Sequence, residues 1–495
     1  MKQDAPATPG GSDKYERAAM FPAYTRDSGP DRTLALYEAK TKRITTEHGE
    51  VLPTGSYEAL VSHMFESNLL VYVHKISLLP FIGDMIDDHA ATCICDKKGR
   101  LSCVRVKRGK QTRWVVQLAS WDLPPEPASL PKLRQMFDYM GVGTSNTPGA
   151  LGFAKMLSVW KKARLGRHTV CNGFGQRFIK ATMSGGRVDT PALGHTAPYM
   201  RVIELDRTSS YLAEFKKPQP CGTTVRFGNG RVDKFTTYYG NVIITILEKL
   251  PLGPFPVRQS KNGKEWIEYP TEPGQYFAVL WKEQVEICRA AGCDVQVLDG
   301  YGWKEMTEDN AVWCDTMYDL KIHAPDDFTE TSIKKSIVAG IGRHGMSDSI
   351  YRLVPESLAE YEDVPFVDNG EMYTWYIHEN TDFFSVSMVH WFAYTIMLAA
   401  VELYKFALPY AADGRLLATN YDSCIVIPSP GDMEKYPSRA DSRELTPGTW
   451  RWEVLTNVWI VAPRSVVCDQ KAILPGIDAD MRQEYIAGLY ARRAS

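Results

Sequence analysis

The order of apolar and polar positions predicts alternating strands and helices over residues 30 to 140. LLVYVHKISLL, from Leu69, and TRWVVQLASWDL, from Thr112, are rich in β-branched and aromatic residues and predict strands. YEALVSHMFE, from Tyr57, and LPKLRQMFDYM, from Leu130, repeat their apolar positions every three to four residues, which predicts helices. This alternation is typical of an α/β domain.

A linker and a second folded region are predicted to follow. Residues 141 to 190 combine a helix around Lys155 to Lys162 with glycine-rich segments, which suits a connection between domains. A strand is then predicted to reach Asp206, and a helix to begin at Tyr211. NVIITIL and CDVQVLDGYGW predict further strands around the helix LWKEQVEICRAAG, which Gly292 would end.

Towards the C-terminus the pattern predicts a capped helix, an apolar helix and a hairpin. TETSIKKSIVAGIG begins with hydroxyl and acidic side chains suited to capping. RLLAT and SCIVIP are strands whose turn is Asn420-Tyr421-Asp422. The apolar segment from Val386 to Leu408 contains His390, Glu402 and Lys405, which are costly in lipid, so a buried helix is preferred to a membrane span and no membrane partner is expected.

Composition fits a folded, multidomain protein. The 495 residues are 44% hydrophobic and 23% charged, enough for two or three domains with substantial cores. The net charge of -2 gives no global signature of a nucleic-acid binder, so such binding would depend on local basic clusters, whose usual explanation is solvated surface. Two clusters occur: Lys97, Lys98, Arg100, Arg105, Lys107, Arg108, Lys110 and Arg113, and Lys161, Lys162, Arg164, Arg167, Arg177 and Lys180.

Cysteine usage and the N-terminal segment predict a cytoplasmic protein. The ten cysteines show no repeated C-x-x-C, and the spacing of Cys93 and Cys95 does not suit a four-ligand zinc site. They are therefore interpreted as reduced thiols. The segment MKQDAPATPGGS lacks the apolar core of a signal peptide, and residues 1 to 20 are expected to form a disordered lead-in.

The candidate chemistry lies in an ordered trio: Asp206, the pair Lys334 and Lys335, and Asp422. Each carboxylate stands where an apolar run meets a turn. Two acids can hold two divalent metal ions and cations can hold a triphosphate, which are the requirements of nucleotidyl transfer. Taken singly, each feature has an ordinary alternative: a solvated turn for Asp206, an Asx-type turn for Asp422 and an exposed helix face for the lysines.

Several segments in this order resemble family B DNA polymerases. VIELDRTSSYL resembles the first polymerase motif, D-x-x-S-x-Y-P, KKSIVAGIG the lysine-bearing fingers helix, and ATNYDSC the hairpin motif Y-x-D-T-D-S. MSGGRV resembles the Y-x-G-G segment, and PGQYFAVLWKEQVEICRAAGCDVQVLDGYGW a palm stretch of the protein-primed branch of phages, viruses and linear plasmids. The likeness covers most of residues 60 to 477.

This resemblance implies a multidomain α+β or α/β fold. An RNase H-like, exonuclease-type N-terminal domain would precede a right-hand polymerase with palm, fingers and a small thumb. The implied segments are 1–20, lead-in; 21–190, exonuclease-like domain and linker; 191–320, first part of the palm; 321–350, fingers helix; 351–440, second part of the palm with the hairpin; and 441–495, thumb and tail.

The resemblance assigns metal and sugar contacts to the first motif. Asp206 and the backbone carbonyl of Arg207 would bind metal. Tyr211 would pack under the incoming sugar and exclude a 2′-hydroxyl, and Ser209 also matches the motif, whereas Leu212 replaces the usual proline. Without the family, Tyr211 is equally well explained as a core aromatic residue.

The hairpin motif would supply the second catalytic acid. Asp422 matches the metal-binding aspartate, with Tyr421 and Ser423 as its motif neighbours. Asn420 stands where the family usually has an acid. Its amide keeps an oxygen ligand but loses a charge, which would weaken metal binding without abolishing it.

The fingers helix would bind the triphosphate. Lys334 falls at the family's lysine position, Lys335 lies beside it, and Arg343 offers a further cation. Val338 and Ile341 replace the family's asparagine and tyrosine. These replacements would affect contacts to the base pair more than binding of the phosphates.

Weaker signals concern DNA. Gly185 and Gly186 permit close approach to a template strand, with Arg187 adjacent; a tight interdomain turn is the alternative. Arg464 falls at the lysine of a K-x-Y segment that steadies the primer end, although Val466 replaces the tyrosine. An exposed arginine at a strand end explains Arg464 nearly as well.

The N-terminal domain is expected to lack exonuclease chemistry. The family's nuclease needs an Asp-x-Glu strand and further acids to hold two metals. No Asp-x-Glu precedes Asp206, and Lys75 and Leu79 occupy the positions where YVHKISLLPF would need Asn and Asp. A lysine there would repel cations.

The implied function is a DNA-directed DNA polymerase, a nucleotidyltransferase of DNA replication that lacks proofreading. It would use two Mg²⁺, with Mn²⁺ able to substitute, and bind DNA primer-template and deoxynucleoside triphosphates, with a terminal priming protein as a further candidate partner. If a phage or plasmid encodes it, it would act in the host bacterial cytoplasm. Two alternatives stay open: a catalytically degenerate descendant that binds nucleic acid or a replication partner, and a nuclease that uses the same acids on another fold.

Overall fold

The chain forms two compact units in the computed structural model. One comprises Met1–Val170 and Met346–Ser387, and the other Cys171–Gly345 and Met388–Ser495; they are called the first and second unit below. The six segments predicted from the sequence are a finer division, and their boundaries remain predictions. The described residues are 32–74, 76, 79–95, 101–163, 165, 173–192, 198–261, 264–345, 349–355, 364–368, 371–379, 388–440, 445–474, 481 and 484–488, so the predicted lead-in over 1–20 lies outside them.

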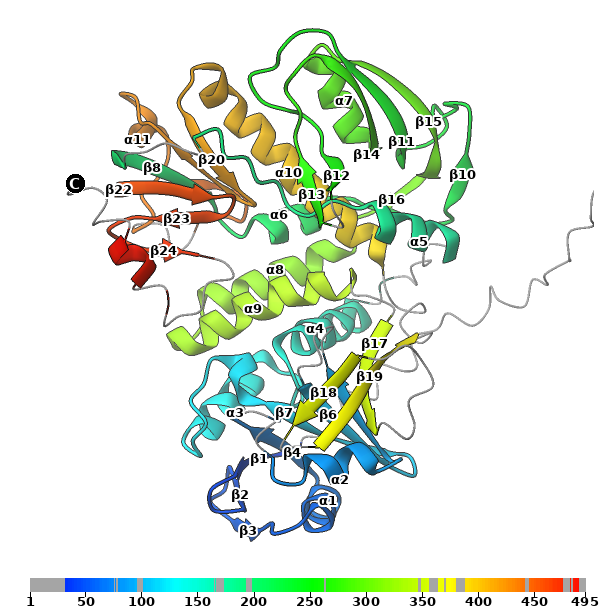
Figure 1. The fold of residues 1–495 in the computed structure, drawn as a ribbon, viewed down its shortest axis with the longest axis vertical. Helices are drawn as coiled ribbons and strands as arrows, with labels where there is room; N and C mark the ends of the chain where they lie inside the picture. The colour runs from blue at the N-terminus through cyan, green and yellow to red at the C-terminus, as the bar shows by residue number, and fades with distance from the viewer. Residues whose placement is uncertain are drawn as a thin grey trace, which may run out of the picture. The chain divides into compact units, whose positions relative to one another are not determined.

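A ten-stranded sheet is the centre of the first unit, in the order β18-β19-β17-β5-β6-β7-β4-β1-β2-β3 (Figure 1). β1 pairs in parallel with β4, and β4 with β7, while the other neighbours are antiparallel. The strands are β1 (Thr33–Glu38), β2 (Arg43–Thr46), β3 (Val51–Pro53), β4 (Leu69–Val73), β5 (Ala91–Cys95), β6 (Leu101–Arg108), β7 (Gln111–Gln117), β17 (Ser349–Pro355), β18 (Val364–Asp368) and β19 (Glu371–Glu379).

Helices follow the strands of this unit as the apolar pattern predicts. β4 is buried along its whole length because it lies between two other strands of the sheet, which accounts for its continuous apolar run. The Ser56 hydroxyl caps the first helix by accepting from the Ala59 backbone N–H at 3.3 Å. The helices are α1 (Tyr57–Glu66), α2 (Ile82–Asp87), η2 (Leu118–Trp121, a 3₁₀ turn), α3 (Ser129–Met140) and α4 (Pro148–Ala163). The predicted helices YEALVSHMFE and LPKLRQMFDYM are thus confirmed. The strand predicted from Leu69 ends at Val73, and the strand predicted from Thr112 ends at Gln117 because Leu118–Trp121 turns into η2.

The second unit contains a six-stranded sheet in the order β20-β21-β8-β22-β23-β24 and a four-stranded sheet in the order β10-β15-β11-β14. Two short antiparallel pairs, β12-β13 and β16-β9, are the other strands among its described residues. They are β8 (Tyr199–Arg207), β9 (Gln219–Cys221), β10 (Val225–Phe227), β11 (Thr237–Ile246), β12 (Val257–Lys261), β13 (Lys264–Glu268), β14 (Gly274–Trp281), β15 (Asp294–Trp303), β16 (Glu305–Thr307), β20 (Leu416–Asn420), β21 (Ser423–Val426), β22 (Trp450–Ala462), β23 (Ser465–Val467) and β24 (Ala472–Ile473).

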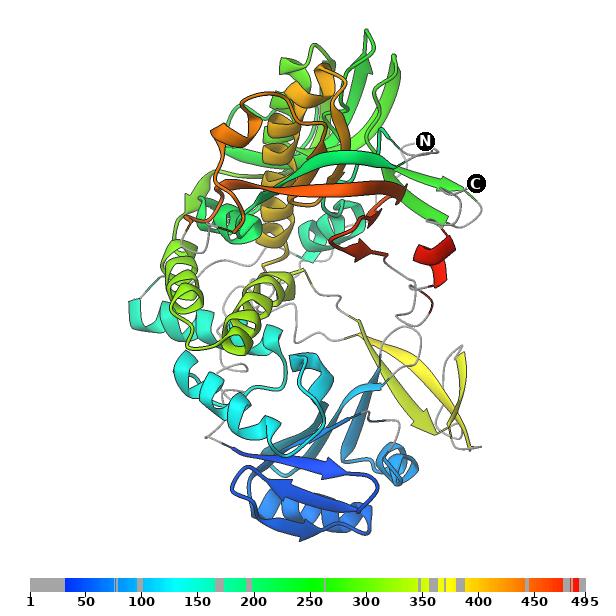
Figure 2. The same ribbon diagram turned by 90° about the vertical axis from the view of Figure 1, so that its left-hand side faces the viewer.

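One long helix, α10 (Val389–Ala412), is the core of the second unit (Figure 2). It is long and apolar enough to cross a membrane by length and composition, but 67% of its most apolar stretch is buried inside the unit. Its side chains pack in one cluster with Ile203 and Leu205 of β8. The predicted buried helix is confirmed, and α10 covers one face of the six-stranded sheet.

Further helices border this sheet. The predicted helix is confirmed, but its cap lies earlier than predicted: α9 begins after Asp326, whose carboxylate accepts from the Thr329 backbone N–H at 2.7 Å, so the segment TETS lies within the helix. α8 and α9 lie side by side (Figure 1). The helices of the second unit besides α10 are α5 (Gly173–Thr182), α6 (Ser210–Lys216), α7 (Lys282–Ala290), α8 (Asn310–Ile322), α9 (Asp327–Arg343) and α11 (Asp432–Lys435).

Candidate functional site

Four neighbouring strands of the six-stranded sheet bring polar side chains into one row. The antiparallel register of β20, β21, β8 and β22 pairs Asn420 with Ser423, Ser423 with Asp206, and Asp206 with Arg451. Residues directly opposite each other on antiparallel strands share a face of the sheet. Leu205 points to the other face and packs in the core of α10. The row therefore lies on the face opposite α10.

Asp422 stands beside this row in the turn between β20 and β21. Tyr421 takes the left-handed conformation, with φ 57°, and the Arg207 backbone N–H donates to the Asp422 carbonyl at 2.9 Å. This bond fastens the turn to the end of β8, which carries Asp206. Burial, and next the charge of Asp206, raise the pKa of Asp422 to about 7, while Lys334 acts in the opposite direction. The fold thus brings the two predicted acids together, with one of the predicted lysines nearby.

Arg451 already holds one of the two acids. Its Nε and Nη2 donate to Oδ2 of Asp206 at 2.9 and 2.7 Å, and the two side chains are 20% and 21% exposed. An arginine is permanently charged, so this contact sets a fixed positive charge against Asp206.

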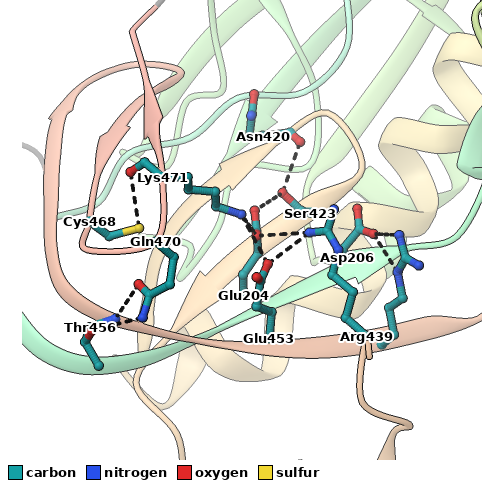
Figure 3. A network of polar contacts seen from close by, with 11 residues as sticks. Glu204, Asp206, Asn420, Ser423, Arg439, Glu453, Thr456, Cys468, Gln470 and Lys471 are labelled. Carbon is teal, nitrogen blue, oxygen red and sulfur yellow. Dashed lines mark hydrogen bonds and ion pairs between the residues drawn. The ribbon is translucent and has the colours of Figure 1, made fainter. Parts of the chain in front are cut away.

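A second row of charged side chains lies on the same face of the sheet, two residues away from the first row along β8 and β22 (Figure 3). Glu204 is buried, accepts from the Ser423 hydroxyl at 3.3 Å and forms an ion pair with Lys471. Glu453 accepts from Arg439 at 3.0 Å and lies 3.4 Å from Lys471. The Ser423 bond holds the start of β21, and hence the turn with Asp422, against β8.

The motif residues after Asp206 serve different purposes. The Arg207 side chain is buried and pairs with Glu214 at 2.6 Å, so only its backbone is available to the site. Ser209 takes the left-handed conformation, with φ 47°, and its hydroxyl accepts from Nζ of Lys321 at 3.3 Å. Burial, then the charge of Asp422, raise the pKa of the Tyr211 phenol, which places Tyr211 beside that acid.

Gly186 lies against two of these aromatic rings. A Cβ atom added at Gly186 would overlap the ring of Tyr421 and approach the Tyr211 hydroxyl to 3.0 Å. One added at Gly185 would meet nothing within 4 Å. Of the predicted glycine pair, Gly186 is therefore the one whose missing side chain allows Tyr211 and Tyr421 to meet.

The segment after Gly186 runs along the free edge of β20. The Tyr421 N–H donates to the Arg187 carbonyl and the Thr419 N–H to the Asp189 carbonyl, each at 2.8 Å. The Arg187 side chain is only 1% exposed, pairs with Asp189 at 2.6 Å and stacks over Tyr269 at 4.2 Å. Arg187 thus braces the hairpin and does not offer its guanidinium at the surface.

The predicted cations of α9 do not share one face. Lys334 is exposed and lies near enough to Asp422 to lower its pKa, while Lys335 and Arg343 are half-buried. At about 100° per residue, Arg343 falls on roughly the opposite side of the helix from Lys334. Val338, one turn beyond Lys334, is 50% exposed, whereas Ile341 is buried.

Two cations of the site were missed from the sequence. Lys321, in the last turn of α8, contacts Ser209, and its pKa is lowered by burial and then by Lys334. Arg451 faces Asp206 only through the register of β22. A basic residue at a helix end and an arginine in an aromatic strand were the available signals, and neither carries information about its distant partner.

A groove of about 850 Å³ adjoins the hairpin turn within the second unit. The exposed Arg464, with φ 67°, covers the ring of Tyr421 at 4.7 Å on one side of it. The other lining residues include Gly186, Lys249, Trp266 and Tyr269. The lining also includes Asp189 and Glu268, so the groove combines aromatic rings with charges of both signs.

The donor set fits a divalent cation. No group of three His, Cys, Asp or Glu side chains that could hold a metal occurs among the described residues, so any ion would need other ligands beside Asp206 and Asp422. The Asn420 side-chain oxygen is buried and has no hydrogen-bond partner within the described part of the chain. Asp206 and Asp422, whose charges act on each other, suit Mg²⁺ or Mn²⁺, which also take water or phosphate oxygens, while Asn420 lies two strands from Asp206 in the same row.

In the first unit, only part of the nuclease prediction can be placed. Leu79 is buried in the apolar core beside Val71 and Val73 of β4. Lys75 lies outside the described residues.

Comparison with known proteins identifies the fold. No family model and no curated protein matches the sequence. Among solved structures, phi29 DNA polymerase complexed with primer-template DNA and incoming nucleotide substrates matches with a TM-score of 0.66 and 11% identity, over 92% of this chain and 94% of that chain. The orthorhombic crystal form of phi29 DNA polymerase gives 0.63 and 12% over the same shares. The chain thus has a mixed α/β, multidomain fold similar to that of phi29 DNA polymerase.

Proposed function

We propose that this protein is a DNA-directed DNA polymerase that adds deoxynucleotides to a primer 3′-hydroxyl or to the hydroxyl of a priming protein. The observation that carries the proposal is the meeting of Asp206 and Asp422 where β8 adjoins the β20-β21 hairpin. The similarity in fold to phi29 DNA polymerase supports it. An acid on a strand and an acid in a turn bonded to that strand suit chemistry that depends on positioning.

Asp206 and Asp422 would hold the divalent metal ions, Mg²⁺ or Mn²⁺ in its place, with the Asn420 amide oxygen and the Arg207 backbone carbonyl as further donors. The bound ions would supply charge stabilisation for the attacking and leaving oxygens. The carboxylates must be ionised for this role. The raised pKa of Asp422 means that the metal-free site holds its second negative charge only reluctantly near neutral pH.

The cations of α8 and α9 would bind the triphosphate of the incoming nucleotide. Lys334 is exposed and within electrostatic reach of Asp422, and Lys321 stands between Lys334 and Ser209. Lys335 would add to the local positive charge, and Arg343, on the far side of α9, contributes least. Tyr211, beside Asp422, would lie under the sugar and exclude a 2′-hydroxyl.

DNA would approach along the groove beside the hairpin turn. Aromatic rings with neighbouring cations suit single-stranded nucleic acid, since bases stack on the rings and phosphates pair with the charges. Arg464 and Gly186 border this groove. The phi29 polymerase structures that resemble this chain contain primer-template or single-stranded DNA.

In this proposal the second unit supplies palm, fingers and thumb. The first unit is an exonuclease-like domain without nuclease chemistry. A terminal priming protein is a candidate partner, because segments such as MSGGRV resemble the protein-primed branch.

A second function has its own support. Arg451 neutralises Asp206, Asn420 replaces an acid, and Val338 exposes an apolar side chain one turn from Lys334. These features would be expected of a degenerate polymerase fold that binds nucleic acid or a replication partner without catalysis.

Primer extension separates the two functions. Full-length protein is incubated with labelled primer-template, deoxynucleotides and Mg²⁺ or Mn²⁺. We expect extension, with a loss of about 10²-fold or more in Asp206→Asn and in Asp422→Asn, because each removes a charged metal ligand. Asp315→Asn, at an exposed ion pair, is the matched control and should stay active.

The other outcomes point to the alternatives. DNA binding without extension in either metal would favour the degenerate binding protein. Shortening of the primer that depends on Asp206 and Asp422 would favour a nuclease.

A further inference from the structure

The two acids of the site are neutralised unequally. Both donors of Arg451 converge on Oδ2 of Asp206, and no described residue donates to its other oxygen. Asp422 has no such ion pair among the described residues, and the cation that acts on it, Lys334, does so through its charge. One acid is thus engaged by a guanidinium and the other is open.

Arg451 is fixed where it stands by the sheet. Its backbone is the second position of a continuous register that runs from Trp450 opposite Arg207 to Val458 opposite Tyr199. A guanidinium cannot lose its proton, so its charge cannot be relieved by titration. A metal ion at Asp206 must either share the carboxylate with this charge or displace it.

Other cations border Arg451. After burial and Lys334, its charge contributes to the lowered pKa of Lys321, and it opposes the burial that raises the pKa of Tyr318, which places all three in one electrostatic neighbourhood. Lys334 is close to Lys321 as well. A cluster of like charges tolerates a further divalent cation poorly but accepts a polyanion readily.

We propose that Arg451 is a resident cation of the metal site. Its guanidinium holds Asp206 in place before metal and nucleotide bind, and its charge lowers the affinity of the free protein for divalent metal. Arg451 is a positioning residue that acts through Asp206. The proposal deepens the proposed function, on which it rests, but it concerns metal binding in the absence of DNA.

The test is a Mn²⁺ titration of metal-free, full-length protein without DNA or nucleotide, followed by the electron paramagnetic resonance of free Mn²⁺. Arg451→Met keeps an unbranched apolar stem in place of the arginine side chain but removes its charge. We expect it to bind Mn²⁺ about tenfold more tightly than the parent, because a cation next to the metal is gone. Arg451→Lys keeps the charge and should stay within about threefold of the parent.

Two further variants test whether the effect is specific to Arg451 and whether it depends on the Asp206 carboxylate. Arg439→Met removes a cation from the neighbouring row, where Arg439 pairs with Glu453, and should leave Mn²⁺ affinity nearly unchanged. In an Asp206→Asn background, Arg451→Met should lose its effect, as expected if it acts through that carboxylate.

Unchanged or weaker Mn²⁺ binding in a folded Arg451→Met protein would overturn the proposal, and so would an equal gain in the Asp206→Asn background. If Arg451→Met fails to fold, the Arg451→Lys titration decides, since a clear gain in affinity with the charge retained contradicts the proposal. Primer extension is scored separately. A protein that gains Mn²⁺ affinity on loss of Arg451 but never extends a primer would support this inference and refute the polymerase.

Discussion

Gly186 shows how one missing side chain can set the geometry of a site. Its α-carbon lies against Tyr421 of the hairpin turn and Tyr211 of the first motif, and a Cβ atom has no room there. Both rings border Asp422, so a shift of either would move the turn that carries this acid. Gly185, its neighbour, faces open space.

We expect Gly186→Ala to lower the free energy of unfolding by about 1 to 3 kcal/mol through overpacking, and to reduce primer extension more strongly than stability alone explains. Gly185→Ala is the matched control and should change stability by no more than about 0.5 kcal/mol. Chemical denaturation and extension assays on both variants check this. Equal behaviour of the two alanine variants would contradict the assigned packing.

At the scale of elements, the segment from Arg187 to Asp189 acts as a cover for the edge strand β20. Backbone bonds to Thr419 and Tyr421 satisfy groups that an edge strand would otherwise expose. The buried pair of Arg187 and Asp189 fixes this segment, and the Thr419 hydroxyl adds a bond to Asp189 at 2.8 Å. The hairpin that holds Asp422 is therefore supported from both sides.

Two ion pairs of equal length allow this support to be measured. Arg187 with Asp189 and Lys216 with Asp315 both lie at 2.6 Å, but the first pair is 1% and 11% exposed and the second 48% and 62%. We expect Asp189→Ala to cost about 3 to 5 kcal/mol, because a buried guanidinium loses its partner. Asp315→Ala should cost less than about 1 kcal/mol. Similar losses in urea unfolding would show that Arg187 is not buried as described.

The elements themselves were largely predictable, because hydrophobic periodicity is a local property of the sequence. The strand at Leu69, the helices at Tyr57 and Leu130 and the hairpin around Asp422 all follow from it. The pairing of Arg451 with Asp206 was not predictable, since it depends on the register of strands far apart in the chain. The resemblance supported Asp206 and Asp422 as partners because it rests on several motifs in a fixed order along the chain. Hydrophobic periodicity contains no information about such distant pairs.

At the scale of the whole molecule, a late segment of the chain joins the sheet of the first unit after most of the intervening residues have formed the second unit. Strand β17 pairs with β5, from Tyr351 opposite Cys95 to Leu353 opposite Cys93, so residues 346–387 belong to the first unit. The chain therefore passes from the first unit to the second and returns before β20 and β21 complete the site. Strand addition of this kind uses backbone bonds and leaves little trace in side-chain pattern.

The first unit would then serve as a scaffold without nuclease activity. We expect the full-length protein, without deoxynucleotides, to leave a labelled primer with a mismatched 3′ end intact in Mg²⁺ or Mn²⁺. The reason is that Leu79, which is buried, stands where the resemblance requires an acid, and no Asp-x-Glu precedes Asp206. A proofreading family B polymerase in the same assay is the positive control. Shortening of the primer that persists in Asp206→Asn would place a working nuclease in the first unit and refute this prediction.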